Sequence, residues 1–98
     1  MLENVELNKD KKKQLKVIAA NCNITMKALI VEEATKIMNE NISVPDSIRE
    51  DEADRTSLII DIDSNFKEDV KLFTYNNNLK IRDLWVFCVD RIIDRYGE

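Results

Sequence analysis

The sequence has 98 residues, 44% of them hydrophobic and 35% charged, with one Gly and one Pro. This length suits one small domain or two very small units that share one core, and so few backbone breakers disfavour a β-sandwich or barrel. No apolar run approaches the roughly 18–20 residues that span a bilayer, and there is no His, the commonest general base and transition-metal ligand. We therefore expect no membrane partner, no enzymatic activity and no metal or other cofactor. Because the start lacks the apolar core of a signal peptide, we expect a cytoplasmic location.

Residues 1–40 predict a strand followed by two helices. Val5 and Leu7 alternate with polar residues, which is the period of a short, half-buried strand. Asn8 or Asp10 can then cap a helix, because a short side-chain oxygen accepts a hydrogen bond from the free amides of the first turn. The apolar residues of this helix recur at spacings of three and four, as Leu15, Ile18, Ala19 and Cys22.

The asparagines at residues 21–23 end the first helix, because Asn tolerates the left-handed backbone conformation in which helices often stop. Thr25 is then a good cap for a second helix, which is apolar around more than half its circumference. A helix with so many apolar residues must pack against other elements on several sides.

The same pattern recurs 55 positions later. Val5 corresponds to Ile60, and Asn8 corresponds to Asp63, another capping residue. The corner asparagines and the apolar positions of both helices also correspond, without a gap. We interpret this agreement as an internal duplication, in which residues 55–98 form a second strand–helix–helix unit.

Residues 41–54 predict a solvated linker, with room for a helical turn after Pro45. This segment carries one basic and five acidic side chains, so most of the formal net charge of −4 lies here. Whole-chain charge therefore does not exclude DNA as a partner, although neither unit is strongly basic.

Pairing of the two units would give each strand a hydrogen-bonding partner and would cover apolar helix surface. A single short strand leaves its backbone groups unpaired, and the apolar stretch "LWVFCV" (residues 84–89) needs cover. We expect a mainly α fold with a two-stranded antiparallel ribbon (α+β), in which the second helices pack at the centre. The two units can pair within one chain, or like units of two chains can pair with each other; the sequence pattern fits both arrangements. The apolar stretch is also compatible with self-association into dimers or higher oligomers.

This order of strand, helix and helix resembles the ribbon-helix-helix DNA-binding proteins of the Arc/MetJ type. The resemblance covers residues 2–38 and 57–93. Because some members carry two units in one chain, it implies tandem ribbon-helix-helix units that form an intrachain pseudo-dimer. In this family the ribbon lies in the major groove of double-stranded DNA, where the base edges are distinguishable.

The resemblance implies that the outward-facing residues of the strands read bases. Carried over, these are Leu2, Asn4 and Glu6 of the first strand and Ser57, Ile59 and Asp61 of the second. Asn4 suits this role because its amide can pair with adenine through two hydrogen bonds. Glu6 and Asp61 can accept from a cytosine amino group, but phosphates repel both.

The resemblance also implies that the amino end of each second helix holds a phosphate with its free amides. The residues expected to bind phosphate are Thr25, Met26, Lys27, Lys80, Ile81 and Arg82, together with Lys9 and Lys11 at the lysine-rich start of the first helix. A solvated helix face is the alternative interpretation of these lysines.

Other conspicuous side chains have structural interpretations. Cys88 lies inside an apolar stretch, which indicates a small buried residue. Trp85 and Phe87 are interpreted as core or partner-facing residues, because no other aromatic residues join them in a base-stacking platform. The carboxylate pair Glu32–Glu33 is interpreted as a solvated face, since no nucleophile or His accompanies it.

From these observations we expect a sequence-specific double-stranded DNA-binding protein. It would be a small transcriptional repressor or regulator, or a plasmid or phage accessory factor in partition or conjugation. The alternative is a protein-binding module on the same scaffold, of the antitoxin or anti-repressor type. In that alternative, an acidic ribbon mimics nucleic acid or docks on a basic protein partner.

Overall fold

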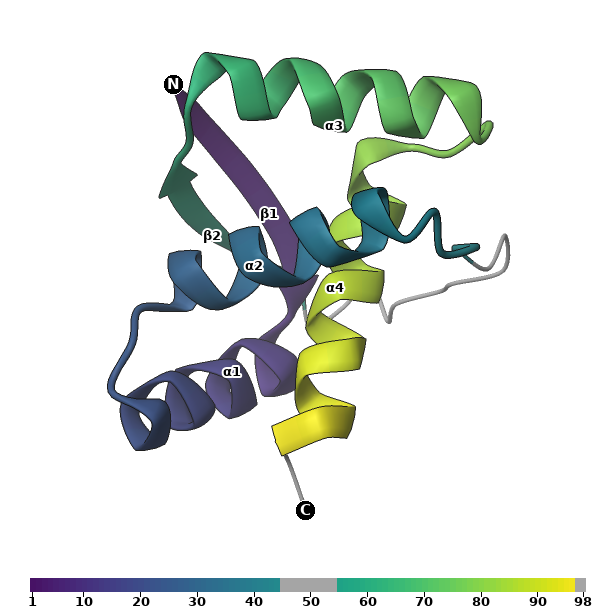
Figure 1. Ribbon diagram of the computed structural model, residues 1–98. Helices are drawn as coiled ribbons and strands as arrows, with labels where there is room; N and C mark the ends of the chain where they lie inside the picture. The colour runs from purple at the N-terminus through teal and green to yellow at the C-terminus, as the bar shows by residue number, and fades with distance from the viewer. Residues whose placement is uncertain (45–54, 97–98) are drawn as a thin grey trace.

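The computed structural model describes residues 1–44 and 55–96. Along these residues the order strand–helix–helix occurs twice (Figure 1). The elements are β1 (Leu2–Asn8), α1 (Lys9–Cys22), α2 (Met26–Asn39), β2 (Arg55–Asp61), α3 (Ser64–Asn76) and α4 (Ile81–Tyr96). The fold is mainly helical with a two-stranded antiparallel sheet, as the sequence predicts. The linker expected over residues 41–54, with its turn after Pro45, lies largely outside the described residues.

The two strands of one chain form the ribbon together. β1 and β2 run antiparallel in a register of seven pairs, with Val5 opposite Leu58 at the centre and Asn4 opposite Ile59 beside it. Successive side chains point to opposite faces, and the inner residues Val5, Leu7 and Ile60 are buried. Both strands of this ribbon belong to the same chain.

Short polar side chains set the ends of the first two helices. The Asn8 side chain accepts a hydrogen bond from the Asp10 amide at 2.8 Å and caps α1. α1 stops at Asn23, whose φ of 58° is left-handed. Thr25 Oγ1 then accepts from the Ala28 amide at 3.0 Å and caps α2. These caps confirm the sequence interpretation of the first corner.

The second strand–helix–helix segment repeats the left-handed turn of this corner but not its side-chain caps. Asn78 has a φ of 59°, matching the left-handed Asn23 55 positions earlier. Asp63 is the N-cap residue of α3, as predicted, but its side chain makes no capping hydrogen bond. Its backbone carbonyl accepts from the Lys67 amide, while its side chain is exposed.

The core lies between the ribbon and the helices α2 and α4. These two helices pack against each other, and α4 also contacts β1, α1 and α3. Figure 1 shows α1 and α3 along opposite edges of the molecule. Trp85 and Cys88 are fully buried in this core, and Phe87 is partly buried against it. The structural interpretation of these three residues is therefore confirmed.

Two carboxylates are buried where elements meet. Glu33 of α2 is only 2% exposed and accepts from Arg91 Nε at 2.8 Å and from Arg95 Nη1 at 2.7 Å, both on α4. Glu3, on the inner face of β1, pairs with Lys67 of α3. The interpretation of Glu33 as part of a solvated face is wrong, because the apolar spacing of three and four along α2 includes its position.

Candidate nucleic-acid interface

The outer face of the ribbon brings together all six residues that the resemblance marks as base-reading. They alternate with the buried residues of each strand and form three cross-strand pairs: Leu2–Asp61, Asn4–Ile59 and Glu6–Ser57. Leu2 is 72% exposed and Ile59 is 64% exposed. The face is therefore accessible, and it combines polar, acidic and apolar side chains.

Arg55 is a basic residue at one end of this face that the sequence reasoning missed. It lies opposite Asn8, and its Nη1 atom is 3.6 Å from Glu6 Oε2. The sequence could have revealed it: Arg55 lies two residues before Ser57, and side chains two residues apart in a strand point to the same face. The outer face therefore carries a cation as well as two carboxylates.

Glu6 connects the ribbon to the amino end of α4. Arg82 Nε, in the first turn of that helix, lies 3.8 Å from Glu6 Oε2, and Arg55 approaches the same oxygen. Arg82 is half-buried, so it is held beside the strand. The negative charge of Glu6 is therefore offset by two cations.

Asp61 occupies the other end of the outer face and is also offset by positive charge. The amino group of Met1 lies 2.8 Å from Asp61 Oδ1. The hydrogen bond and charge of this amino group hold the pKa of the Asp61 carboxyl below its usual value, and the nearby charge of Lys27 lowers this pKa further. Each carboxylate of the outer face is thus influenced by a cation in the first turn of α2 or α4.

The amino end of α2 is a favourable place for an anion. Thr25 caps it, and its first turn contains no acidic residue. Lys27 is exposed there, whereas Met26 is half-buried against the core. The free amides, the helix dipole and Lys27 all favour negative charge at this position.

The amino end of α4 differs because it contains Asp83, which the sequence reasoning did not single out. Asp83 Oδ2 accepts from the Lys80 amide at 3.3 Å. A carboxylate here stabilises the helix end, but it also occupies an amide and repels a phosphate. Lys80 is exposed, and Ile81 packs partly against the core. The two helix ends are therefore unequal as anion sites.

The lysines at the start of α1 have different surroundings. Lys9 is exposed. Lys11 Nζ lies 2.7 Å from Asp90 Oδ1 of α4, and Lys12 Nζ donates to the Ser57 carbonyl at 2.9 Å. Lys11 and Lys12 therefore make contacts within the protein, which tie α1 to α4 and to β2.

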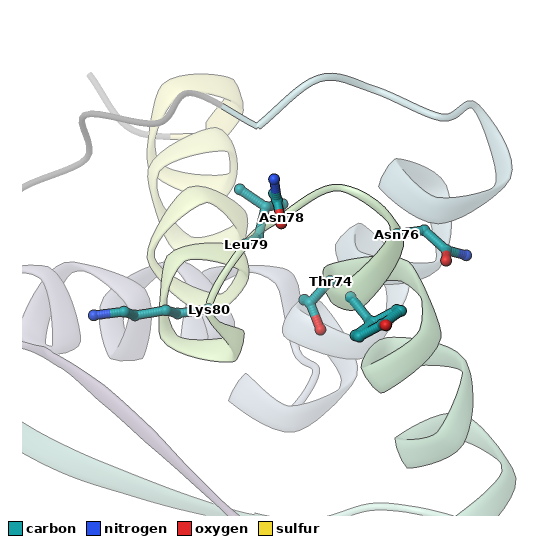
Figure 2. A pocket seen from close by; sticks show the side chains of 6 residues that line it. Thr74, Asn76, Asn78, Leu79 and Lys80 are labelled. Carbon is teal, nitrogen blue, oxygen red and sulfur yellow. The ribbon is translucent and has the colours of Figure 1, made fainter.

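A shallow depression lies at the corner between α3 and α4 (Figure 2). The Thr74 hydroxyl is committed to the Val70 and Lys71 carbonyls, each at 3.0 Å. Figure 2 shows the Lys80 and Asn76 side chains extending away in opposite directions. The polar groups here do not converge on a common point, so the ribbon remains the stronger candidate for a functional surface.

No protein-family model, curated protein or solved structure matches the chain. Within residues 1–44 and 55–96, no three His, Cys, Asp or Glu side chains come close enough together to hold a metal ion. None of the helices in the described part of the chain has the length and apolar character needed to cross a bilayer.

Proposed function

We propose that the chain is a tandem of two strand–helix–helix units that pair with each other. The register of the ribbon supports this. Asn4 faces Ile59, the residue 55 positions later, while Leu2 faces Asp61 and Glu6 faces Ser57. Shifting either of the flanking pairs by 55 positions gives the other, which is the pattern of a two-fold axis through the Asn4–Ile59 pair. The left-handed corner residues Asn23 and Asn78 support the same relation.

We further propose that this paired unit binds double-stranded DNA with the outer face of the ribbon in the major groove. The observation that carries the proposal is the closeness of the ribbon to both second-helix ends. Arg82 contacts Glu6, and the charge of Lys27 acts on Asp61. Groups suited to base edges and groups suited to phosphates therefore lie side by side, as major-groove recognition requires.

In this proposal the protein is a small transcriptional repressor or regulator, or a plasmid or phage accessory factor. Asn4 reads an adenine and Ser57 makes a second polar base contact. The amino end of α2, with Thr25 and Lys27, is the stronger phosphate anchor, because the corresponding end of α4 contains Asp83. The cations beside Glu6 and Asp61 reduce the repulsion between these carboxylates and the DNA backbone.

A protein-binding module is the second candidate function. The exposure of Leu2 and Ile59 favours it, because apolar side chains on an exposed face can bury area against a protein partner. The flanking carboxylates Glu6 and Asp61 would then select a basic partner, as an antitoxin or anti-repressor does.

The deciding experiment is selection of bound sequences from a random duplex DNA library at near-physiological salt, with circular dichroism on the same sample to verify folding. Enrichment of a short motif is expected. An Asn4→Ala/Ser57→Ala variant should lose that motif, while the control Asn65→Ala, at an exposed site on α3, should keep it. A folded protein that enriches no motif would contradict DNA recognition and favour the protein-binding candidate.

A further inference from the structure

The buried contact between α2 and α4 joins one carboxylate to two cations. Glu33 supplies the carboxylate from α2, and Arg91 and Arg95 supply the guanidinium groups from α4. Both oxygens of Glu33 accept charge-assisted hydrogen bonds. The two helices pack together across the centre of the molecule (Figure 1), so this cluster lies at the junction of the two units.

The cluster is not repeated by the 55-residue relation. The position equivalent to Glu33 is Cys88, and those equivalent to Arg91 and Arg95 are Lys36 and Glu40. Burial raises the pKa of the Cys88 thiol, and the nearby charge of Glu33 raises it further. Cys88 therefore stays a neutral thiol and does not replace the carboxylate as a counter-ion.

Pairing of like units would produce poorer contacts at this place. Two first units would bring Glu33 beside Lys36 and Glu40 of the other copy, so it would exchange two guanidinium groups for one ammonium group and one carboxylate. Two second units would place the guanidinium groups beside Cys88 without the Glu33 carboxylate. Glu33 is only 2% exposed, so weaker compensation of its charge is costly, whereas Arg91 and Arg95 are 28% and 34% exposed and keep part of their hydration.

A second buried ion pair opposes pairing between second units. Glu3 pairs with Lys67, and the position equivalent to Glu3 is the buried Leu58. If two second units paired, Lys67 would lie beside Leu58 and lose its carboxylate. This cost adds to that of the uncompensated arginines.

We propose that the Glu33–Arg91–Arg95 cluster makes the first unit select a second unit as its partner rather than another copy of itself. This inference rests on the tandem organisation proposed above and not on DNA binding. The cluster determines specificity of pairing, while the apolar core supplies most of the affinity between the units.

Two charge-inverted full-length chains test this proposal. The first carries Glu33→Arg, and the second carries Arg91→Glu together with Arg95→Glu. In either chain alone, like charges meet between α2 and α4. In a mixture, the first unit of each chain complements the second unit of the other, so exchange of units restores both clusters. We expect native mass spectrometry to record a shift from one chain to a 1:1 heterodimer when the two are mixed and refolded.

A matched variant and a restored chain complete the design. Glu32→Arg makes the same charge change at the exposed neighbouring position and should give no heterodimer with the Arg91→Glu/Arg95→Glu chain. A single chain carrying all three cluster substitutions should regain the native unfolding midpoint, because its charges are complementary again. If either inverted chain fails to fold alone, recovery of helical circular dichroism on mixing is the readout.

Three outcomes would overturn the proposal. One is a mixture that forms no heterodimer and recovers no structure. Another is equal heterodimer formation by the Glu32→Arg chain, which would mean that net charge, and not the position of Glu33, decides pairing. The third is a triple variant that remains unfolded. Because none of these measurements includes DNA, failure here and failure of the DNA-binding proposal are distinguishable.

Discussion

The guanidinium of Arg82 lies 3.8 Å from the carboxylate of Glu6, so the first turn of α4 is held against the first strand. This contact joins a residue expected to bind phosphate to one expected to face bases. Both side chains are partly exposed, so the pair is available to a ligand that competes for either charge. Its strength therefore bears directly on how DNA would approach the ribbon.

Replacing Glu6 by Gln should strengthen DNA binding. The substitution removes a carboxylate that repels phosphates and releases Arg82 to neutralise one. The slope of log binding constant against log salt concentration should steepen by up to about one unit, as expected for one additional phosphate contact. Stability should change by less than about 1 kcal/mol, because the two side chains are partly exposed and their closest charged atoms are 3.8 Å apart. Fluorescence anisotropy at several salt concentrations measures the slope.

Glu68→Gln is the control for that prediction, because it makes the same charge change at an exposed position of α3. It should leave the slope nearly unchanged. An equal effect of both substitutions would mean that only net charge matters, and that Arg82 has no specific part in binding.

Replacing Asn4 by Ala should weaken binding to the preferred sequence by about 1–3 kcal/mol and relax the preference at one base position. Asn4 is exposed at the centre of the outer face, opposite Ile59. Titration of the selected duplex and of its single-base variants measures both effects. Unchanged discrimination at every position would show that Asn4 does not read a base.

Replacing Thr25 by Ala should lower the free energy of unfolding by about 1 kcal/mol, because the Ala28 amide loses its capping acceptor. Thr35→Ala is the matched control, since that exposed hydroxyl donates only to the Val31 carbonyl of its own helix. The control should change the free energy by less than about 0.5 kcal/mol. Urea denaturation measures both, and equal losses would argue against a special role for the cap.

The Asp61 carboxyl should titrate below the ordinary value of 3.8 in the folded protein. Because folding lowers this pKa, the stabilisation that it contributes is present above pH 3.8 and is lost as the pH falls through the folded-state value. Carbon-13 NMR of the carboxyl group measures the midpoint. Acetylation of the amino terminus should raise it more than Lys27→Ala does, since the amino group is the largest cause of the shift. The reverse order would mean that the contact with Met1 is not formed in solution.

Local patterns predicted most of the secondary structure. The alternation around Val5 and the caps at Asn8 and Thr25 depend on neighbouring residues, so sequence alone contained them. Asp63 occupies the predicted N-cap position of α3, but its side chain does not make the expected hydrogen bond. Cap chemistry identifies the residue type that a helix start favours, but the rotamer and the surrounding water decide whether the hydrogen bond forms.

The charged contacts were harder to anticipate, because they join residues far apart in the chain. Glu33 was interpreted as solvated, although its spacing within α2 matched the buried face. Its partners on α4 depend on how the two helices cross, which no local pattern specifies. The same holds for Asp83 and Arg55, whose effects on the candidate interface come from the elements that they adjoin.

The distance along the chain between interacting elements has a consequence for synthesis on the ribosome. The backbone groups of β1 stay unpaired until β2, which begins at Arg55, has been synthesised. Glu33 must wait longer, until Arg91 and Arg95 have been translated and have left the exit tunnel. Until these residues emerge, the nascent chain holds an unpaired first strand and a Glu33 carboxylate without its arginine partners, so these long-range contacts cannot guide the early steps of folding.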